Sequence, residues 1–249
     1  MLVETNVIII LIFVIFLAST VKATVGFGFA LVSTPLLLPI LDLTTIVPII
    51  MPLVLINDYI IAFENKKYLK PDKILPIAGS AILGIPLGII ILSNLDMYVL
   101  KIIISIIILI AALFLFTGKT INIKREKLTS MFAGFFSGIL VSTSGLSGPP
   151  ITIFLINQKW EKLDFRNNLA LYFSIIDTVT VISLFISGFI TQETLIANLY
   201  LIPSVLIGYL IGKNILPLIN QQLFTKIIIV IIMTGASLTL FTTLRGQFF

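Results

Sequence analysis

Between two apolar segments in the second half of this chain lies the run Ser142-Thr143-Ser144-Gly145-Leu146-Ser147-Gly148-Pro149-Pro150. Its glycines allow tight turns and the close approach of other backbone, its hydroxyl groups are hydrogen-bond donors, and its prolines suit the first turn of a helix. A shorter run of the same kind, Thr24-Val25-Gly26-Phe27-Gly28, lies in the first half. We therefore expect two helical hairpins, each with a glycine-rich junction at its tip.

The composition excludes a water-soluble domain. Of the 249 residues, 58% are hydrophobic and 11% are charged, and the mean hydropathy is +1.18. These values predict an all-α polytopic membrane protein. The chain has no cysteine and no histidine, which excludes a disulfide, a Cys/His zinc site and a histidine proton relay. The net charge of +5 comes from basic residues beside membrane segments, so we expect no nucleic-acid partner.

The apolar segments are of two kinds. Six are close to the roughly 20 residues with which a helix spans a bilayer, namely 44–63, 74–92, 97–117, 167–189, 196–213 and 223–244. The other four form two adjacent pairs, 7–21 with 25–40 and 128–143 with 146–157. The sequence thus predicts two hairpins of short helices and six full spans.

The basic residues predict the orientation in the membrane. If each hairpin returns to its starting side, thirteen of the sixteen fall on one face: Lys66, Lys67, Lys70, Lys73, Lys119, Lys124, Arg125, Lys127, Lys159, Lys162, Arg166, Lys213 and Lys226. Because cytoplasmic loops are enriched in lysine and arginine, we expect this face to be cytoplasmic and both termini to be extracytoplasmic. The expected location is the plasma membrane.

The two halves of the chain match each other. Gly26 corresponds to Gly145 and Asp58 to Asp177, both at an offset of 119. Further matches at 124 or 125 are Gly84 and Gly88 with Gly208 and Gly212, Lys101 with Lys226, and Phe116 with Phe241. Since three spans follow each hairpin, the second half would enter the membrane from the opposite side. We expect one membrane domain of two inverted-topology repeats, 1–120 and 121–249, as in many secondary transporters.

The hairpin tips are the candidate binding site. In inverted-repeat transporters the substrate lies near the midplane where discontinuous helices meet, and helix N-termini suit an anion. The candidate anion-binding residues are Lys22, Thr24, Gly26, Gly28, Ser144, Gly145, Ser147 and Gly148. The alternative is that these small residues only let helices pack. That packing role is what we predict for Gly84-x-x-x-Gly88 and Gly208-x-x-x-Gly212.

Charged residues inside or beside the spans have two interpretations. Asp58 and Asp177 are candidates for proton coupling, because intramembrane acids are costly and usually functional; the alternative is a structural hydrogen bond. Lys22 could offer a positive charge to an anion or extend to the membrane interface. Arg166 is a candidate gate residue, with topology anchoring as its alternative.

The chain resembles the TauE/SafE family of sulfite and organosulfonate exporters. The resemblance rests on Gly26-Phe27-Gly28-Phe29-Ala30 with Pro35, on Gly145-Leu146-Ser147-Gly148-Pro149-Pro150, and on the stretch from Phe165 to Phe173. It implies export of sulfite, sulfoacetate or a related small anion, driven by an ion gradient. At the first junction Phe27 and Phe29 interrupt the denser glycine run that is typical of the family.

The sequence therefore predicts a secondary transporter of a small sulfur-containing anion, working by alternating access, rather than an enzyme. The expected partners are the anion and the lipid bilayer, without a cofactor or metal, and the oligomeric state stays open. Two alternatives remain: an intramembrane aspartyl protease that uses Asp58 and Asp177, and a membrane scaffold that transports nothing.

Overall fold

The protein is described from a computed structural model. The structure describes residues 5–64, 66–117, 126–156 and 162–215, together with residues 230, 233, 237, 240, 241 and 244. Its helices are α1 (Thr5–Val25), α2 (Phe29–Leu37), α3 (Leu43–Glu64), the 3-10 turn η1 (Lys66–Tyr68), α4 (Pro71–Asn94), α5 (Met97–Thr117), α6 (Glu126–Ser144), α7 (Gly148–Ile156), α8 (Lys162–Ile186) and α9 (Gln192–Ile215).

Five described helices, α1, α3, α4, α8 and α9, are long and apolar enough to cross a membrane. Their surfaces fit a lipid environment: on α4, Leu83 is 70% exposed, while polar groups such as Asp58 and Asn57 on α3 are fully buried. This distribution is that of an all-α, multi-pass membrane protein, as predicted. The predicted span 223–244 lies almost entirely outside the described residues.

The first arm of each hairpin is longer than the sequence suggested. We expected a short helix over 7–21, but α1 has 21 residues and continues through Lys22 to Val25. The helix ends where Gly26 adopts a left-handed backbone with φ of +91°, a common way to end a helix. Lys22 does not break α1 because its ammonium group is buried in an ion pair. In the second hairpin, α6 likewise has 19 residues and ends before Gly145, whose φ is +75°.

Helix α8 begins before its predicted start. We expected 167–189 from the apolar residues alone, whereas the helix runs over Lys162–Ile186. Its first turns carry charged residues, so the helix extends beyond the apolar segment that defined the prediction.

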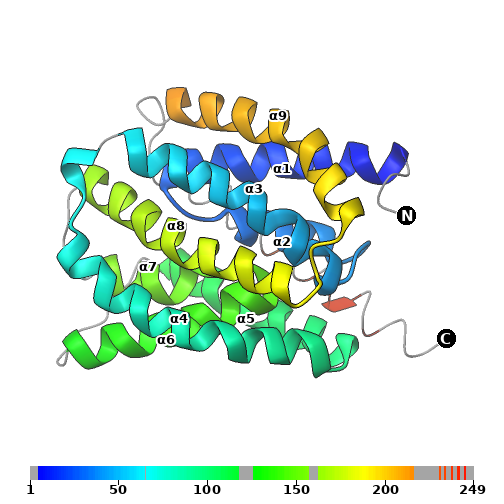
Figure 1. Cartoon of the computed structure of the whole chain (residues 1–249). Coiled ribbons are helices and arrows are strands. Elements are labelled where there is room, and N and C mark those ends of the chain that lie inside the picture. Colours follow the sequence, from blue (N-terminus) through cyan, green and yellow to red (C-terminus); the bar gives the residue numbers. More distant parts are fainter. Residues whose placement is uncertain are drawn as a thin grey trace.

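The helices form a layered bundle with α3 and α8 in contact at its centre (Figure 1). Helix α1 packs along α9 on one side of this central pair, and α4 packs along α6 on the other. The short helices α2 and α7 pack on α1 and α6 within their own hairpins. The two halves therefore have equivalent neighbours: the hairpin helix of each half packs against the second helix after the hairpin of the other half.

Glycines allow the close contact between α4 and α6. A Cβ atom at Gly84 would lie 2.2 Å from the Phe135 carbonyl oxygen, and one at Gly88 would lie 2.4 Å from that of Ile139. No side chain fits at these distances, so the α6 backbone rests directly on the two glycines.

The same contact recurs between α9 and α1. A Cβ atom at Gly208 would lie 2.6 Å from the Phe16 carbonyl oxygen, and one at Gly212 would lie 2.4 Å from that of Thr20. Phe16 and Thr20 are 119 positions before Phe135 and Ile139, so the repeat offset holds for the contacted residues as well. The predicted packing role of the glycine pairs is confirmed.

Replacing Gly84 by alanine is expected to lower the free energy of unfolding by about 1–3 kcal/mol, because α4 and α6 must separate to admit the methyl group. Thermal unfolding in detergent, followed by circular dichroism, measures this. Gly79→Ala is the matched control on the same helix, since a Cβ there meets nothing within 4 Å. Equal stability of the two variants would contradict the packing role.

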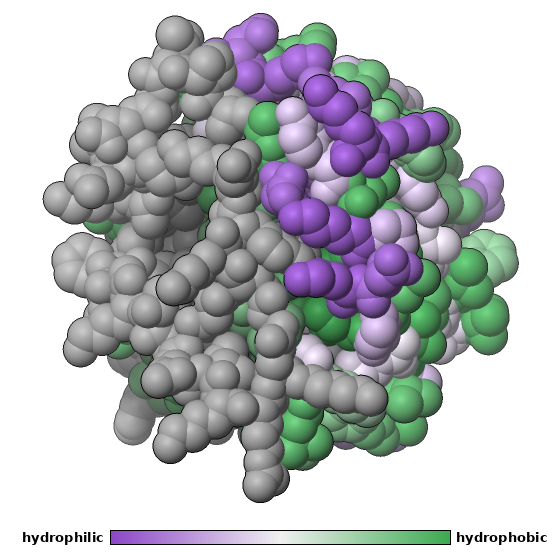
Figure 2. Space-filling model, turned by 90° about the vertical axis from the view of Figure 1, so that its left-hand side faces the viewer, coloured by the Kyte–Doolittle hydropathy of each residue, from purple (hydrophilic) through white to green (hydrophobic). Residues whose placement is uncertain are grey.

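Described basic residues gather at one end of the bundle. Lys66 and Lys67 form part of η1, Lys70 precedes α4, and Lys213 lies in the last turn of α9. Figure 2 shows this end, where hydrophilic side chains cover much of the described surface. The arrangement agrees with a single basic face. The predicted positions Lys119, Lys124, Arg125, Lys159 and Lys226, and both chain termini, lie outside the described residues.

Candidate functional site

The two hairpin tips meet around a small pocket. Its volume is about 20 Å³, which is room for one or two water molecules. The lining residues are Lys22, Gly28, Phe29, Ala30, Leu31, Val54, Gly145, Leu146, Ser147, Gly148 and Phe173. Five residues predicted from the sequence, Lys22, Gly28, Gly145, Ser147 and Gly148, are thus brought together.

The pocket lies near the middle of the central helices. Val54 is close to the midpoint of α3 and Phe173 close to that of α8, and these two residues are themselves 119 positions apart. Beside them the Tyr59 hydroxyl and the Thr178 hydroxyl share a hydrogen bond of 2.9 Å across the same offset. The pocket therefore lies where equivalent parts of the two halves face each other.

The first turn of α2 forms one wall. Gly28 has φ of +100° and precedes the helix as its N-cap, and Phe29, Ala30 and Leu31 follow it along the wall. The N–H groups at the start of a helix have no partner within the helix and carry partial positive charge. This wall therefore suits an anion.

The second junction forms the opposite wall. Gly145 is held in its left-handed conformation, and a Cβ there would lie 2.6 Å from Cδ1 of Ile50. At Gly148, the first residue of α7, a Cβ would meet only Phe27, at 3.7 Å. Ser147 places its carbonyl group against the Ser137 hydroxyl, which donates to it at 2.7 Å.

Most of the junction hydroxyl groups serve helix packing. Thr24 donates to the carbonyl groups of Thr20 and Gly212 at 2.8 and 3.0 Å, and Ser144 donates to that of Leu140 at 2.9 Å. Neither Thr24 nor Ser144 lines the pocket. For these two residues the structure favours the packing alternative.

Ser142 and Thr143 follow the same pattern. Ser142 donates to Ile85 of α4 at 3.0 Å and to Gly138 of its own helix at 2.9 Å. Thr143 donates to Ile139 at 2.7 Å. A serine or threonine in a helix can always bond the carbonyl one turn earlier, so a dense run of hydroxyl groups does not by itself indicate a ligand.

Lys22 connects the pocket to a buried carboxylate. Its Nζ lies 2.7 Å from Oδ1 and 2.8 Å from Oδ2 of Asp58, and 4.5 Å from the centre of the Phe173 ring. The lysine side chain is 3% exposed and the aspartate 0%. A lysine so deeply buried is not extended to the membrane interface, so that alternative for Lys22 is wrong.

Asp177 belongs to the same cluster. It is 1% exposed on α8, its carboxyl group interacts directly with that of Asp58, and its Oδ1 has no hydrogen-bond partner among the described residues. The two acids that the repeat paired in sequence are therefore neighbours in space.

Arg166 contacts the first hairpin tip from α8. Its Nε donates to the Ala23 carbonyl group at the end of α1 at 3.0 Å, and its side chain packs on Gly26, where a Cβ would lie 3.0 Å from Cγ. Its Nη1 lies 3.7 Å from Oε2 of Glu64. Gly26 therefore serves the contact with Arg166, and it does not line the pocket.

Sequence reasoning missed the role of Glu64. Its carboxylate accepts a hydrogen bond from Tyr209 at 2.7 Å and pairs with Lys213, so it links α3 to α9 as well as to Arg166 on α8. An acid at the end of a span is common, and the sequence contained no signal that singled it out.

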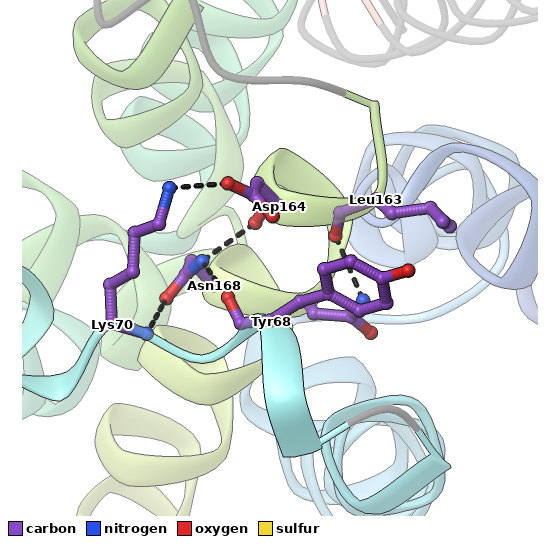
Figure 3. A network of polar contacts seen from close by, with 6 residues as sticks. Tyr68, Lys70, Leu163, Asp164 and Asn168 are labelled. Atoms are coloured by element: carbon purple, nitrogen blue, oxygen red, sulfur yellow. Dashed lines mark hydrogen bonds and ion pairs between the residues drawn. The ribbon is translucent and has the colours of Figure 1, made fainter.

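A second network holds the start of α8 (Figure 3). Lys70 pairs with Asp164, and its backbone N–H donates to the Asn168 side chain at 2.6 Å. Asn168 in turn donates to the Tyr68 carbonyl group at 2.8 Å. The basic end of the bundle is thus joined by two polar networks that both include α8.

Comparison with known proteins gives one result. A protein-family model described as "Sulfite exporter TauE/SafE" matches residues 11–239. Neither the curated proteins nor the solved structures gave a match.

Proposed function

Because this chain belongs to the TauE/SafE family of sulfite exporters, we propose that it exports a small sulfur-containing anion, such as sulfite or an organosulfonate, across the plasma membrane. It is a membrane transporter of the kind that the family implies. The substrate and the transport cycle are the proposed part.

The observation that carries this proposal is the pocket between the hairpin tips. One wall is the N-terminal turn of α2, another is the glycine junction before α7, and Lys22 also lines the pocket. Backbone N–H groups and one lysine offer hydrogen-bond donors in the middle of an apolar bundle, which is how an anion can be held without histidine.

We expect alternating access by movement of the two repeats, 1–120 and 121–249, against each other. The pocket is smaller than a sulfite ion with its hydration shell, so substrate must enter in a more open conformation. The polar networks of Glu64 and Asp164 join helices of both repeats at the basic end. Breaking them would open a path from the cytoplasm, with Arg166 as the gate.

The test is uptake of labelled sulfite, thiosulfate, sulfoacetate and sulfate into liposomes that contain the purified protein. Uptake of at least one anion above empty liposomes supports the proposal. If none is taken up under any gradient of pH or potential, transport is wrong and the scaffold alternative returns. Proteolysis of a model transmembrane helix, abolished by Asp58→Asn, would instead support the protease.

If Arg166 is the gate, its removal should make the pocket more accessible from the basic end of the bundle. Because the chain has no cysteine, the thiol of an Ala30→Cys variant reports on the pocket wall alone. Adding Arg166→Ala is expected to speed its labelling by an impermeant maleimide from the basic end about tenfold, since a charge-assisted hydrogen bond is worth about 1.5–3 kcal/mol.

Lys213→Ala is the control for the gate. This variant removes the lysine that pairs with Glu64. It leaves the hydrogen bond from Arg166 to the Ala23 carbonyl group in place, so labelling should stay slow. Equal labelling rates with and without Arg166→Ala would show that Arg166 does not close this path.

A further inference from the structure

Lys22 belongs to two sites at once. It lines the pocket together with Gly28, Gly145 and Phe173, while its ammonium group lies within 2.8 Å of both carboxylate oxygens of Asp58 and 4.5 Å from the centre of the Phe173 ring. An anion that enters the pocket and bonds to Lys22 must therefore compete with Asp58 for the same positive charge.

The charges of this cluster do not balance when both acids are ionised. Lys22 contributes one positive charge, while the interacting carboxyl groups of Asp58 and Asp177 contribute two negative charges. All three side chains are buried. An uncompensated charge at such a position is expensive, so one proton shared by the two carboxyl groups restores neutrality.

Few other groups could neutralise the two carboxylates. Lys22 faces Asp58 from α1, and Asp177 faces Asp58 from α8. Tyr172 is the further titratable group beside Asp177. The next charges along α3 and α9, those of Glu64 and Lys213, pair with each other. Among the described residues, Lys22 is the one cation in contact with the acid pair.

We propose that each anion that binds in the pocket takes Lys22 from Asp58 and brings one proton onto the Asp58–Asp177 pair. This inference rests on the proposed function of the pocket. Before binding, the cluster holds one proton and Lys22 neutralises Asp58. After binding, the anion occupies Lys22, and Asp58 is neutralised by a second proton taken from solution.

The flexible stem of lysine makes this exchange possible. A primary ammonium group carries three donors that can be redistributed among acceptors by rotation. The Nζ atom already lies over the Phe173 ring at the pocket wall, so a small displacement suffices to move it from the carboxylate toward the pocket.

The consequence is electrically neutral cotransport. A singly charged anion and one proton cross together, so membrane potential does not drive the movement. Export then proceeds while the outward gradient of the anion exceeds the inward gradient of protons, and external acid drives uptake into liposomes.

The first experiment counts protons. The purified protein in weakly buffered detergent solution is mixed with methanesulfonate, thiosulfate or sulfite, and binding and proton uptake are measured together by calorimetry and a pH indicator. Wild type is expected to take up one proton per bound methanesulfonate, an anion that has no titratable proton of its own near neutral pH. Lys22→Met, which lacks the cation that the anion takes, should bind neither the anion nor the proton. Asp42→Asn removes a carboxylate paired with Lys101 elsewhere and should behave as wild type.

The second experiment needs no variant and covers the case in which Lys22→Met does not fold. Uptake of methanesulfonate, whose single charge does not change with pH, into liposomes is measured with an acidic exterior and, separately, with an imposed potential. Uptake should rise at least several-fold with external acid and stay unchanged with potential.

The outcomes separate the two proposals. Methanesulfonate binding without proton uptake, methanesulfonate binding by Lys22→Met, or methanesulfonate transport driven by potential would overturn the exchange while leaving anion transport intact. Failure of all these anions to bind or move would overturn the proposed function itself.

Discussion

Valine in place of Gly148 should reduce anion uptake by reconstituted protein on the order of 100-fold, a loss that corresponds to about 3 kcal/mol of binding free energy. A Cβ at this position has room beside Phe27, at 3.7 Å, and Gly148 is not among the glycines with positive φ. The valine methyl groups would therefore take up space in the pocket. Because Gly148 directly precedes Pro149, which restricts the backbone of a larger residue, thermal unfolding in detergent is measured alongside uptake, and the loss of uptake should exceed any loss of stability.

Gly79→Val is the control for this variant. A Cβ at Gly79 meets nothing within 4 Å, and the residue lies on α4 away from the pocket lining. It should be at least as stable as Gly148→Val and transport normally. Normal transport by Gly148→Val would mean that the anion does not pass between the hairpin tips.

Gly148 is a sharper test than Gly145, although bulky residues at Gly145 or Ser147 should also abolish binding. Any side chain at Gly145 meets Ile50 and must adopt a left-handed backbone, which costs roughly 1–2 kcal/mol. Gly188 has the same φ of +75° and open space around it. Gly188→Ala therefore measures the backbone cost alone, and the further loss in Gly145→Ala belongs to packing and the pocket.

Lys22→Met should abolish uptake and lower the free energy of unfolding by about 3 kcal/mol, because it leaves Asp58 buried without its partner. The double variant Lys22→Met/Asp58→Asn should recover most of the stability, since replacing both members of a buried pair is often nearly neutral. It should not recover uptake, because the pocket still lacks its cation. Unfolding in detergent and liposome uptake measure the two effects separately.

The ion pair of Lys101 and Asp42 provides the matched control. Its Nζ–Oδ1 distance is also 2.7 Å, but the Asp42 side chain is 56% exposed. Lys101→Met should therefore cost at most about 1 kcal/mol and leave uptake unchanged. If Lys22→Met were no more destabilising than Lys101→Met, the buried pair would not stabilise the bundle; if it transported anions, Lys22 would not bind them.

The membrane helices followed directly from the sequence. An apolar run long enough to span the bilayer must form a helix, because the hydrocarbon offers no partners for its backbone, and α3, α4, α5 and α9 lie close to the predicted ranges. Helix ends were less accurate. Hydropathy predicts that a helix ends at a charged residue, whereas α1 continues past Lys22 until Gly26 ends it.

Part of the candidate site was also predictable. A positive φ is a local property that few residues other than glycine adopt. Gly28 and Gly145, which have it at the two junctions, could therefore be predicted from the sequence alone. Hydroxyl groups have no such constraint. Thr24 and Ser144 bond carbonyl groups, and whether a hydroxyl faces a carbonyl or a pocket depends on the neighbouring helix.

By itself, then, the sequence determined that this is a polytopic membrane protein of the TauE/SafE type with two glycine hairpins, because hydropathy and backbone freedom are local properties. The folded bundle was needed to show that Lys22 lies with Asp58 and Asp177 at the pocket, and that Arg166 contacts the end of α1. Those contacts link residues from α1, α3 and α8. Which charges become neighbours in an apolar bundle depends on how its helices cross, and that crossing is set by close packing at glycines on neighbouring helices, such as Gly212 against Thr20 and Ala23 beside Lys22.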